Sequence, residues 1–177
     1  SIDASVIAGT DGACDQRGGS LVRGRGALGF GWLWGRADEG IFPNEGYGAA
    51  GPLGCSFDAE CAALRELLRD LRRNLTDGTL RTLREEAATR GRLLTICIWT
   101  DSLSAIDALA EGGRGTLDSE LLSLTTCLND VAELALVRIG HVKGHAGVSV
   151  NERADTLAEQ GLEMQMGIIE AGIVEEA

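Results

Sequence analysis

The sequence is poor in several features that mark other protein classes. It has only two histidines, two prolines and one lysine, Lys143. No apolar run approaches the roughly 18 residues of a membrane span, and the longest, LLTICIW at 93–99, suits a buried strand. The first residues, SIDASVIAG, lack the basic segment and the long apolar core of a secretion signal. We therefore expect no membrane partner and an intracellular location, nuclear or cytoplasmic.

The cysteines do not form a disulfide or zinc-binding pattern. The chain has five, an odd number, and no CxxC pair occurs. Without an export signal they are expected to be reduced thiols. Cys61 and Cys97 fall on apolar faces and are predicted to lie in the core.

Charge alone argues against a nucleic-acid partner. The net charge is −11, whereas phosphate binding normally requires Lys and Arg. The distribution weakens that objection, because eight of the 16 basic residues fall between 65 and 92. The segment 163–177 has four acids and no base. Part of the acidity therefore belongs to a tail.

Alternation and helical spacing predict one α/β domain. Strands are expected over 5–12, 28–35, 44–51, 93–101 and 135–142, and helices over 58–74, 79–90, 101–111, 117–134 and 149–162. The first three strands should form an antiparallel meander, and the strands at 93–101 and 135–142 should add in parallel through helical crossovers. The expected fold is a mixed five-stranded sheet with helices on both faces. The domain would span residues 1–162, with 76–92 as an inserted helical segment and 163–177 as an acidic tail or linker.

Two aspartates follow predicted neighbouring strands. Asp11 comes after VIAGT, where an Asp-Gly turn is the simpler interpretation. Asp101 comes after ICIWT, where a helix N-cap is the simpler interpretation. Since the carboxyl ends of parallel strands are where α/β sheets place their sites, two such aspartates also predict a site.

Two further acids lie beside apolar helix faces. Glu60 shares the face of the leucines at 64, 67 and 71, where a charge is costly unless something compensates it. Proximity to the helix N-terminus would be a milder explanation. Asp155 flanks the stripe of the last helix one turn after Asn151, and an exposed polar edge would explain it equally well. Four carboxylates converging together would need a hard cation, Mg²⁺ or Mn²⁺, and two such ions can assist phosphodiester hydrolysis.

Four motifs resemble the ribonuclease H family, in its type 1 and retroelement branch. They are TDGAC (10–14), AECAAL (59–64), TDSLSAI (100–106) and VKGHAGVSVNERADTLA (142–158), and the last is the most specific. The resemblance covers about residues 3–162. It implies an RNase H-like fold and hydrolysis of the RNA strand of RNA–DNA hybrids, leaving a 5′-phosphate and a 3′-hydroxyl.

The same resemblance assigns roles to individual residues. Asp11, Glu60, Asp101 and Asp155 would be catalytic carboxylates holding two Mg²⁺ ions, which Mn²⁺ can replace. His145, on a glycine-containing loop, would assist proton transfer or product release. The candidate substrate contacts are Gly12, Cys14, Ser56, Ser102 and Asn151.

Some features depart from cellular members of the family. Only EGGRGT (111–116) stands where many carry a basic protrusion, and GCSFDAE (54–60) is closer to retroelement sequences. We therefore expect a domain of a retroelement polyprotein, tethered beside a reverse transcriptase. The alternatives are a catalytically silent nucleic-acid-binding or scaffold domain of the same fold, and a DNA nuclease or resolvase of the same superfamily.

Overall fold

The protein is built on one mixed sheet of five strands. The structure, a computed structural model, describes residues 4–15, 25–112, 118–142 and 149–176. The strands are β1 (Val6–Asp15), β2 (Gly26–Arg36), β3 (Asn44–Gly54), β4 (Thr95–Thr100) and β5 (Leu136–His141), in the spatial order β3-β2-β1-β4-β5. β1, β2 and β3 are antiparallel, whereas β4 and β5 add in parallel. The predicted sheet is confirmed.

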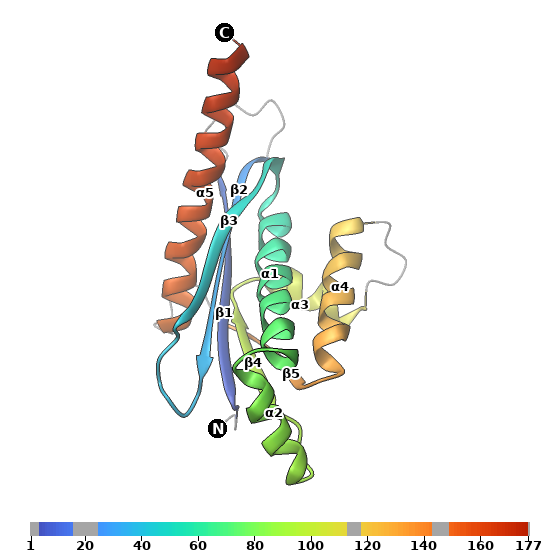
Figure 1. Cartoon of the computed structure of the whole chain (residues 1–177). Helices are drawn as coiled ribbons and strands as arrows, with labels where there is room; N and C mark the ends of the chain where they lie inside the picture. Colours follow the sequence, from blue (N-terminus) through green and yellow to red (C-terminus); the bar gives the residue numbers. More distant parts are fainter. Residues whose placement is uncertain (1–3, 16–24, 113–117, 143–148, 177) are drawn as a thin grey trace.

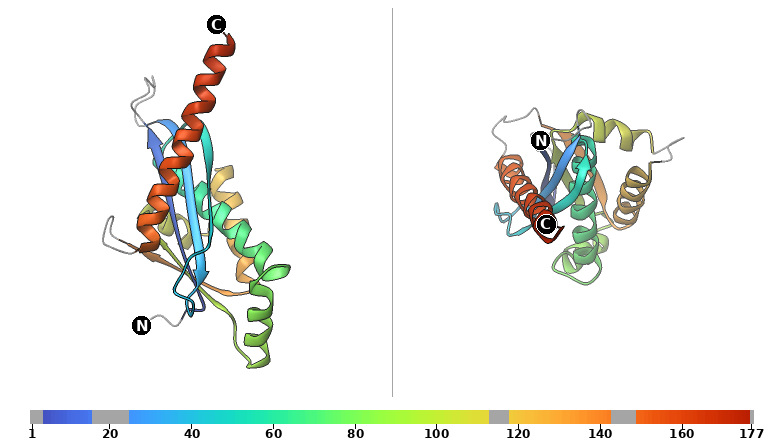
Figure 2. Two further views of the ribbon diagram at one scale, coloured as in Figure 1. Left: turned by 60° about the vertical axis from the view of Figure 1, so that its left-hand side comes forward. Right: turned by 90° about the horizontal axis from the view of Figure 1, so that it is seen from above.

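Five helices cover the two faces of this sheet. They are α1 (Ser56–Thr76), α2 (Leu80–Thr89), α3 (Leu103–Ala110), α4 (Ser119–Ala132) and α5 (Ser149–Glu176). Helix α5 lies alone against one face, and α1 and α4 lie on the other (Figures 1 and 2). The sheet is therefore the middle layer of three. The candidate site residues come from the strands of this layer or from the helices that cover its two faces.

The main core lies between the sheet and α1. Leucine spacing on α1 turns one stripe inward, and Leu64, Leu67, Leu68, Leu71 and Leu75 are fully buried. Trp34 of β2 packs in the same core, and its indole N–H donates to Asp70 Oδ2 at 2.8 Å. A thinner apolar layer joins β1 and β2 to α5. The five cysteines, all within the described part of the chain, form no disulfide, and Cys61 and Cys97 are buried as predicted. None of the helices described is long and apolar enough to cross a membrane.

Two predicted boundaries are wrong. β1 does not end in a turn at Asp11 and Gly12 but continues to Asp15, because β2 pairs with it over that whole length. The last helix does not stop near Leu162 but continues to Glu176. The glycines there are too weak to end it, and Gln165 is buried and accepts the Gly51 N–H at 3.0 Å. The division of the chain into a domain and a tail stays a prediction.

Candidate active site

The two aspartates of the central strands lie side by side. In the parallel pair, Gly9 of β1 lies opposite Trp99 of β4. Asp11, on β1, and Asp101, directly after the end of β4, each come two residues later. Asp101 is not the cap of α3. That role belongs to Ser102, whose side chain accepts the Ala105 N–H at 3.2 Å. The Asp101 carboxylate is therefore available for another partner.

Glu60 reaches the same place from α1. It is the fifth residue of the helix, and its side chain lies among the buried residues, only 8% exposed. The milder explanation, a glutamate in solvent at the helix N-terminus, therefore does not apply. One of its oxygens, Oε2, is buried without a hydrogen-bond partner among the described residues. A buried carboxylate oxygen without a donor is a position that a cation can occupy.

Two glycines allow both helices to approach Asp11. A Cβ on Gly12 would lie 2.5 Å from the Ala59 carbonyl carbon, next to Glu60 on α1. Gly31, directly opposite Asp11 on β2, faces α5, and a Cβ there would lie 2.5 Å from the Ala158 backbone nitrogen. Larger residues at Gly12 or Gly31 would push α1 or α5 outward. The two glycines therefore determine how closely the acids on β1, α1 and α5 can approach one another.

The carboxylates converge strongly enough to alter their own ionisation. Ligand oxygens of Asp11, Glu60 and Asp101 all lie within 4.8 Å of one another. Burial, and then the charges of Glu60 and Asp101, raise the pKa of Asp11 to about 10. Burial and the charge of Asp101 raise the pKa of Glu60 to about 8, although hydrogen bonds from Asp11 and the Gly12 backbone act in the opposite direction. Without a cation, Asp11 and Glu60 are therefore largely protonated at neutral pH.

This donor set fits a hard divalent cation. The three ligands are carboxylates, which Mg²⁺ and Mn²⁺ prefer to the nitrogen and sulfur ligands typical of zinc. A cation would remove the mutual repulsion and would occupy the position facing Glu60 Oε2. The residues present therefore fit a divalent metal ion, which Asp11, Glu60 and Asp101 would hold.

Asp155 and Asn151 approach this group from α5. Asp155 is partly buried, and a hydrogen bond between its carboxyl group and that of Asp11 contributes to the raised pKa of Asp11. It therefore adjoins the three-carboxylate group. Asn151, one turn earlier, is only 5% exposed, and its side-chain oxygen has no partner among the described residues. Asn151 and Asp155 lie one turn apart on α5, as predicted.

The other predicted site residues have mixed positions. The Gly12 N–H donates to Asp11 Oδ1 at 2.9 Å, and the Ser102 N–H donates to Thr100 Oγ1 at 3.1 Å, so both stabilise the site's backbone. Cys14 donates from Sγ to the Gly54 carbonyl at 3.5 Å, and Ser56 is exposed at the start of α1. His145 lies outside the described residues.

Sequence reasoning missed two contributors. Gly31 was not singled out, although a glycine opposite the first aspartate is a signal once the hairpin register is known. Thr100 was also overlooked. A Thr-Asp pair lies within β1 and another spans the end of β4, and both threonines, Thr10 and Thr100, are fully buried. That repeated pair was visible in the sequence.

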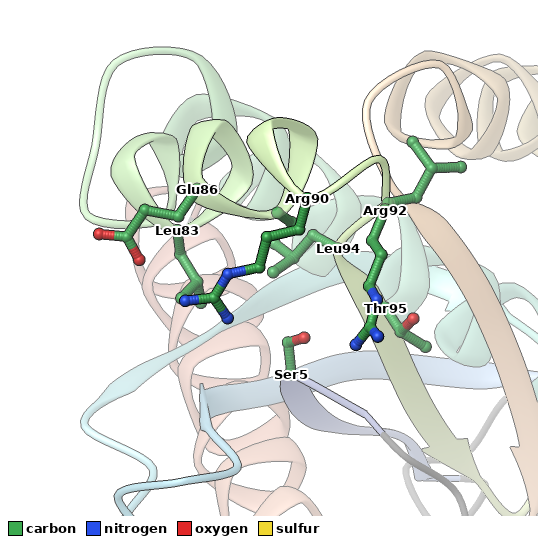
Figure 3. Close-up of a pocket in the computed structure, with 9 residues that line it drawn as sticks. Ser5, Leu83, Glu86, Arg90, Arg92, Leu94 and Thr95 are labelled. Atoms are coloured by element: carbon green, nitrogen blue, oxygen red, sulfur yellow. The ribbon is translucent and has the colours of Figure 1, made fainter.

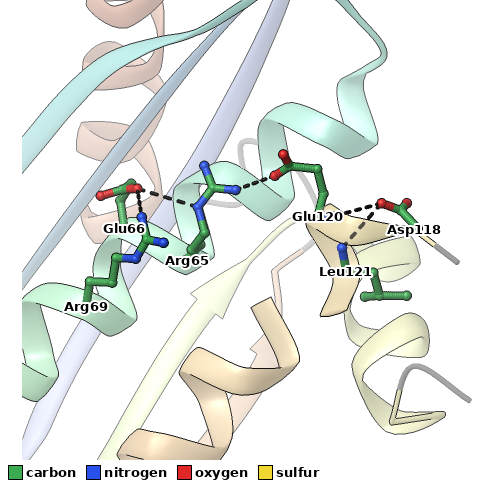
Figure 4. A network of polar contacts seen from close by, with 6 residues as sticks. All are labelled: Arg65, Glu66, Arg69, Asp118, Glu120 and Leu121. Atoms are coloured by element: carbon green, nitrogen blue, oxygen red, sulfur yellow. Dashed lines mark hydrogen bonds and ion pairs between the residues drawn. The ribbon is translucent and has the colours of Figure 1, made fainter. Parts of the chain in front are cut away.

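The arginines of α1 do not present free charge to a phosphate backbone. Arg65 pairs with Glu120 of α4 and with Glu66, and Arg69 also pairs with Glu66 (Figure 4). Arg72 pairs with Asp130 of α4 at 2.7 Å, and Arg73 with Asp70 at 2.8 Å. The α1 half of the basic stretch is therefore neutralised by α4 and by α1 itself.

Comparison with known proteins agrees with this geometry. A family model described as RNase H matches residues 3–163. RNase H1 from the halophilic archaeon Halobacterium salinarum is 25% identical, with a TM-score of 0.58 over 89% of this chain and 97% of that one. LC11-RNase H1, isolated from compost by a metagenomic approach and solved with an RNA/DNA hybrid, is 17% identical, with a TM-score of 0.62 over 89% and 96%.

A third solved structure places the same fold inside a longer chain. The protease-reverse transcriptase of prototype foamy virus is 18% identical, with a TM-score of 0.61, and the match covers 90% of this chain but 21% of that one. A search among curated proteins found no significant match. Over residues 3–163, the chain belongs to the RNase H family.

Proposed function

We propose that this protein is a divalent-metal-dependent endoribonuclease that hydrolyses the RNA strand of RNA–DNA hybrids. The observation that carries the proposal is the convergence of Asp11, Glu60 and Asp101, whose ligand oxygens lie within 4.8 Å of one another. Membership of the RNase H family supports the same reaction class. LC11-RNase H1, which has the same fold, has been solved with an RNA/DNA hybrid.

Each site residue has a physical role in this mechanism. Asp11, Glu60, Asp101 and Asp155 would hold two Mg²⁺ ions, for which Mn²⁺ can substitute. When bound, such a pair supplies activation of a water and stabilisation of the leaving oxygen, giving a 5′-phosphate and a 3′-hydroxyl. Ser102 keeps Asp101 free by capping α3 in its place. His145 is proposed to assist proton transfer or product release.

Recognition of the hybrid is proposed to use groups close to these carboxylates. Gly12, Cys14, Ser56 and Ser102 lie on β1 and at the starts of α1 and α3. Asn151 lies one turn before Asp155, and its Oδ1 has no hydrogen-bond partner among the described residues. Preference for RNA would come from contacts to ribose 2′-hydroxyls. The ion-paired arginines of α1 contribute little, so binding by the isolated domain should be weak.

We further propose that the domain acts as part of a retroelement polyprotein, tethered beside a reverse transcriptase. Residues 1–162 would be the catalytic unit and 163–177 the acidic extension. The foamy virus protease-reverse transcriptase provides a precedent for this fold within a longer polypeptide. Tethering would raise the effective concentration of substrate, which the net charge of −11 opposes.

A cleavage assay tests the reaction. The purified protein should cut a labelled RNA–DNA hybrid with Mg²⁺ or Mn²⁺ and not with EDTA. Asp101→Asn should abolish cleavage while leaving the circular dichroism spectrum unchanged. Asp107→Asn, an exposed aspartate on α3, is the matched control and should retain activity.

Substrate comparison separates the rival functions. Metal-dependent cleavage of double-stranded DNA in preference to the hybrid would indicate a DNA nuclease or resolvase. Hybrid binding without any metal-dependent cleavage would indicate a silent scaffold. Either result would overturn the proposed activity.

A further inference from the structure

A pocket at the far end of the sheet is not used by the proposed reaction. It has a volume of about 240 Å³ and lies between the end of α2 and the first residues of β1 and β4. Its lining includes Ser5, Thr95, Glu86, Arg90 and Arg92, above the apolar side chains of Leu83 and Leu94. Ser5 lies six residues before Asp11 along β1, which corresponds to about 20 Å of extended strand. The pocket is therefore separate from the carboxylate site.

The backbone turn after α2 places two arginines on this pocket. Helix α2 ends at Thr89 with Arg90 as its C-cap, and Gly91 has a φ of 66°. The Arg92 N–H donates to the Ala87 carbonyl and the Gly91 N–H to the Ala88 carbonyl, both at 2.9 Å, as in a Schellman motif. Both guanidinium groups extend toward Ser5 (Figure 3). The turn is hydrogen-bonded, so the two arginines leave the backbone at defined positions.

Arg90 and Arg92 differ from most arginines on the same side of the sheet, although Arg84, also without an ion pair among the described residues, donates to the Leu75 carbonyl at 3.0 Å. Arg65, Arg69, Arg72, Arg73 and Arg81 each have a carboxylate partner. Within the described part of the chain, Arg90 and Arg92 have no ion pair. The lone carboxylate lining the pocket, Glu86, is near enough to Arg36 to affect its pKa. Two unpaired guanidiniums facing one pocket are unexpected in a protein whose net charge is −11.

The chemistry of the lining selects an anion with several acceptor oxygens. Guanidinium groups match the oxygens of phosphate in a bidentate way, and the hydroxyls of Ser5 and Thr95 add donors. The backbone at the pocket floor is already used, because the Ser5 N–H donates to the Thr95 carbonyl at 2.9 Å. The volume is below the roughly 300 Å³ at which pockets for drug-sized ligands begin, so it suits one phosphate group rather than a large cofactor.

We propose that the pocket formed by Ser5, Thr95, Arg90 and Arg92 binds a phosphate group. Arg90 and Arg92 supply the charge, and the two hydroxyls supply orientation. The phosphate belongs either to a nucleic-acid strand or to a free phosphate compound. The site is independent of the carboxylates and needs no metal ion.

Binding can be measured without the catalytic metals. In buffer with EDTA and at matched ionic strength, inorganic phosphate or pyrophosphate should raise the melting temperature of the wild-type protein relative to chloride. It should also shift the amide NMR signals of Ser5, Gly91 and Thr95. Arg90→Ala with Arg92→Ala should weaken the affinity at least about tenfold, because charge-assisted hydrogen bonds are lost.

The neighbouring acid and a matched arginine sharpen this test. Glu86→Gln removes the negative charge from the lining and should tighten phosphate binding. Arg81, on α2, is paired with Glu85 and does not line the pocket. The Arg81→Ala variant should therefore bind phosphate as tightly as the wild type does. An unchanged response in the Arg90/Arg92 double variant, or no response in the wild type, would overturn the proposal.

A second arm identifies the source of the phosphate. The double variant and Arg81→Ala are compared for binding to an RNA–DNA hybrid in EDTA. A larger loss in the double variant assigns the site to a nucleic-acid strand. Equal hybrid binding, together with loss of the pyrophosphate response, assigns it to a free phosphate compound.

Discussion

Replacing Glu60 by glutamine should stabilise the metal-free protein while abolishing its activity. The carboxylate is 8% exposed, and burial and the charge of Asp101 raise its pKa from 4.5 to about 8. In the folded state without a cation, Glu60 is therefore mostly protonated near neutral pH, whereas in the unfolded chain it is ionised. Folding must take up a proton, which glutamine does not require.

The size of the effect follows from this difference in pKa. Each pKa unit corresponds to about 1.36 kcal/mol, and neutral pH lies about 2.5 units above the unfolded value, which gives at most about 3 kcal/mol. For a protein of this size, about 1 kcal/mol moves the melting temperature by about 2–4 °C. The Glu60→Gln variant should therefore melt up to about 10 °C higher than the wild type in EDTA.

The sign of the pH dependence provides a second measurement. Between the unfolded pKa of 4.5 and the folded value of about 8, the folded protein holds the proton and the unfolded chain does not. Wild-type stability contributed by Glu60 is therefore complete at low pH and is lost as the pH rises through this window. The variant should have a shallower decline, and Mg²⁺ should stabilise it less than it stabilises the wild type.

A matched control lies on the same helix. Glu66 is ion-paired with Arg69 at 2.8 Å near the surface, and Glu66→Gln should lower stability by less than about 1 kcal/mol. Thermal melts in EDTA across the pH range compare all three proteins. A Glu60→Gln variant that is less stable than the wild type, or that has the same pH slope, would refute the idea that burial and the charge of Asp101 raise the pKa of Glu60.

Three further outcomes are expected. Asp70→Ala leaves the buried indole N–H of Trp34 without its acceptor and should cost about 1–3 kcal/mol in urea unfolding, whereas no loss would contradict that hydrogen bond's role. Mg²⁺ binding should release protons and should strengthen as the pH rises, because Asp11 and Glu60 must ionise to bind the ion. Calorimetry in buffers of different ionisation enthalpy measures the protons released. Binding without proton release would argue against the raised pKa values. Arg72→Gln should leave the salt dependence of hybrid binding unchanged, because Arg72 is already paired with a carboxylate; a slope reduced by about one would show that it contacts phosphate.

Local patterns were enough to predict the sheet and the positions of the acids. Alternation in 28–35 and the apolar run at 93–99 identify strands, and leucine spacing identifies the buried face of α1 together with Glu60. The convergence of Asp11 and Asp101 could be anticipated, because two parallel neighbouring strands lead to an aspartate at the same edge of the sheet. No local pattern predicts how closely α1 and α5 pack against β1 and β2, because that distance depends on the contacts of Gly12 and Gly31 in the folded protein.

The failures came from long-range pairing. β1 continues past Asp11 because β2 lies beside it, and the sequence around Asp11 contains only a turn-like Asp-Gly pair. Helix α5 passes Leu162 because Gln165 contacts Gly51, 114 positions away in the chain. The sequence also does not reveal that Glu120 and Asp130 of α4 pair with Arg65 and Arg72 of α1.

The close packing at Gly31 has a consequence for how relatives are recognised. A descendant could preserve every acid of the site and still lose its chemistry through one added methyl group on a strand that carries none of them. Screening genomes by the acids alone would count such a protein as active. A reliable signature must also include glycine at this position, where the backbone of α5 leaves no room for a side chain.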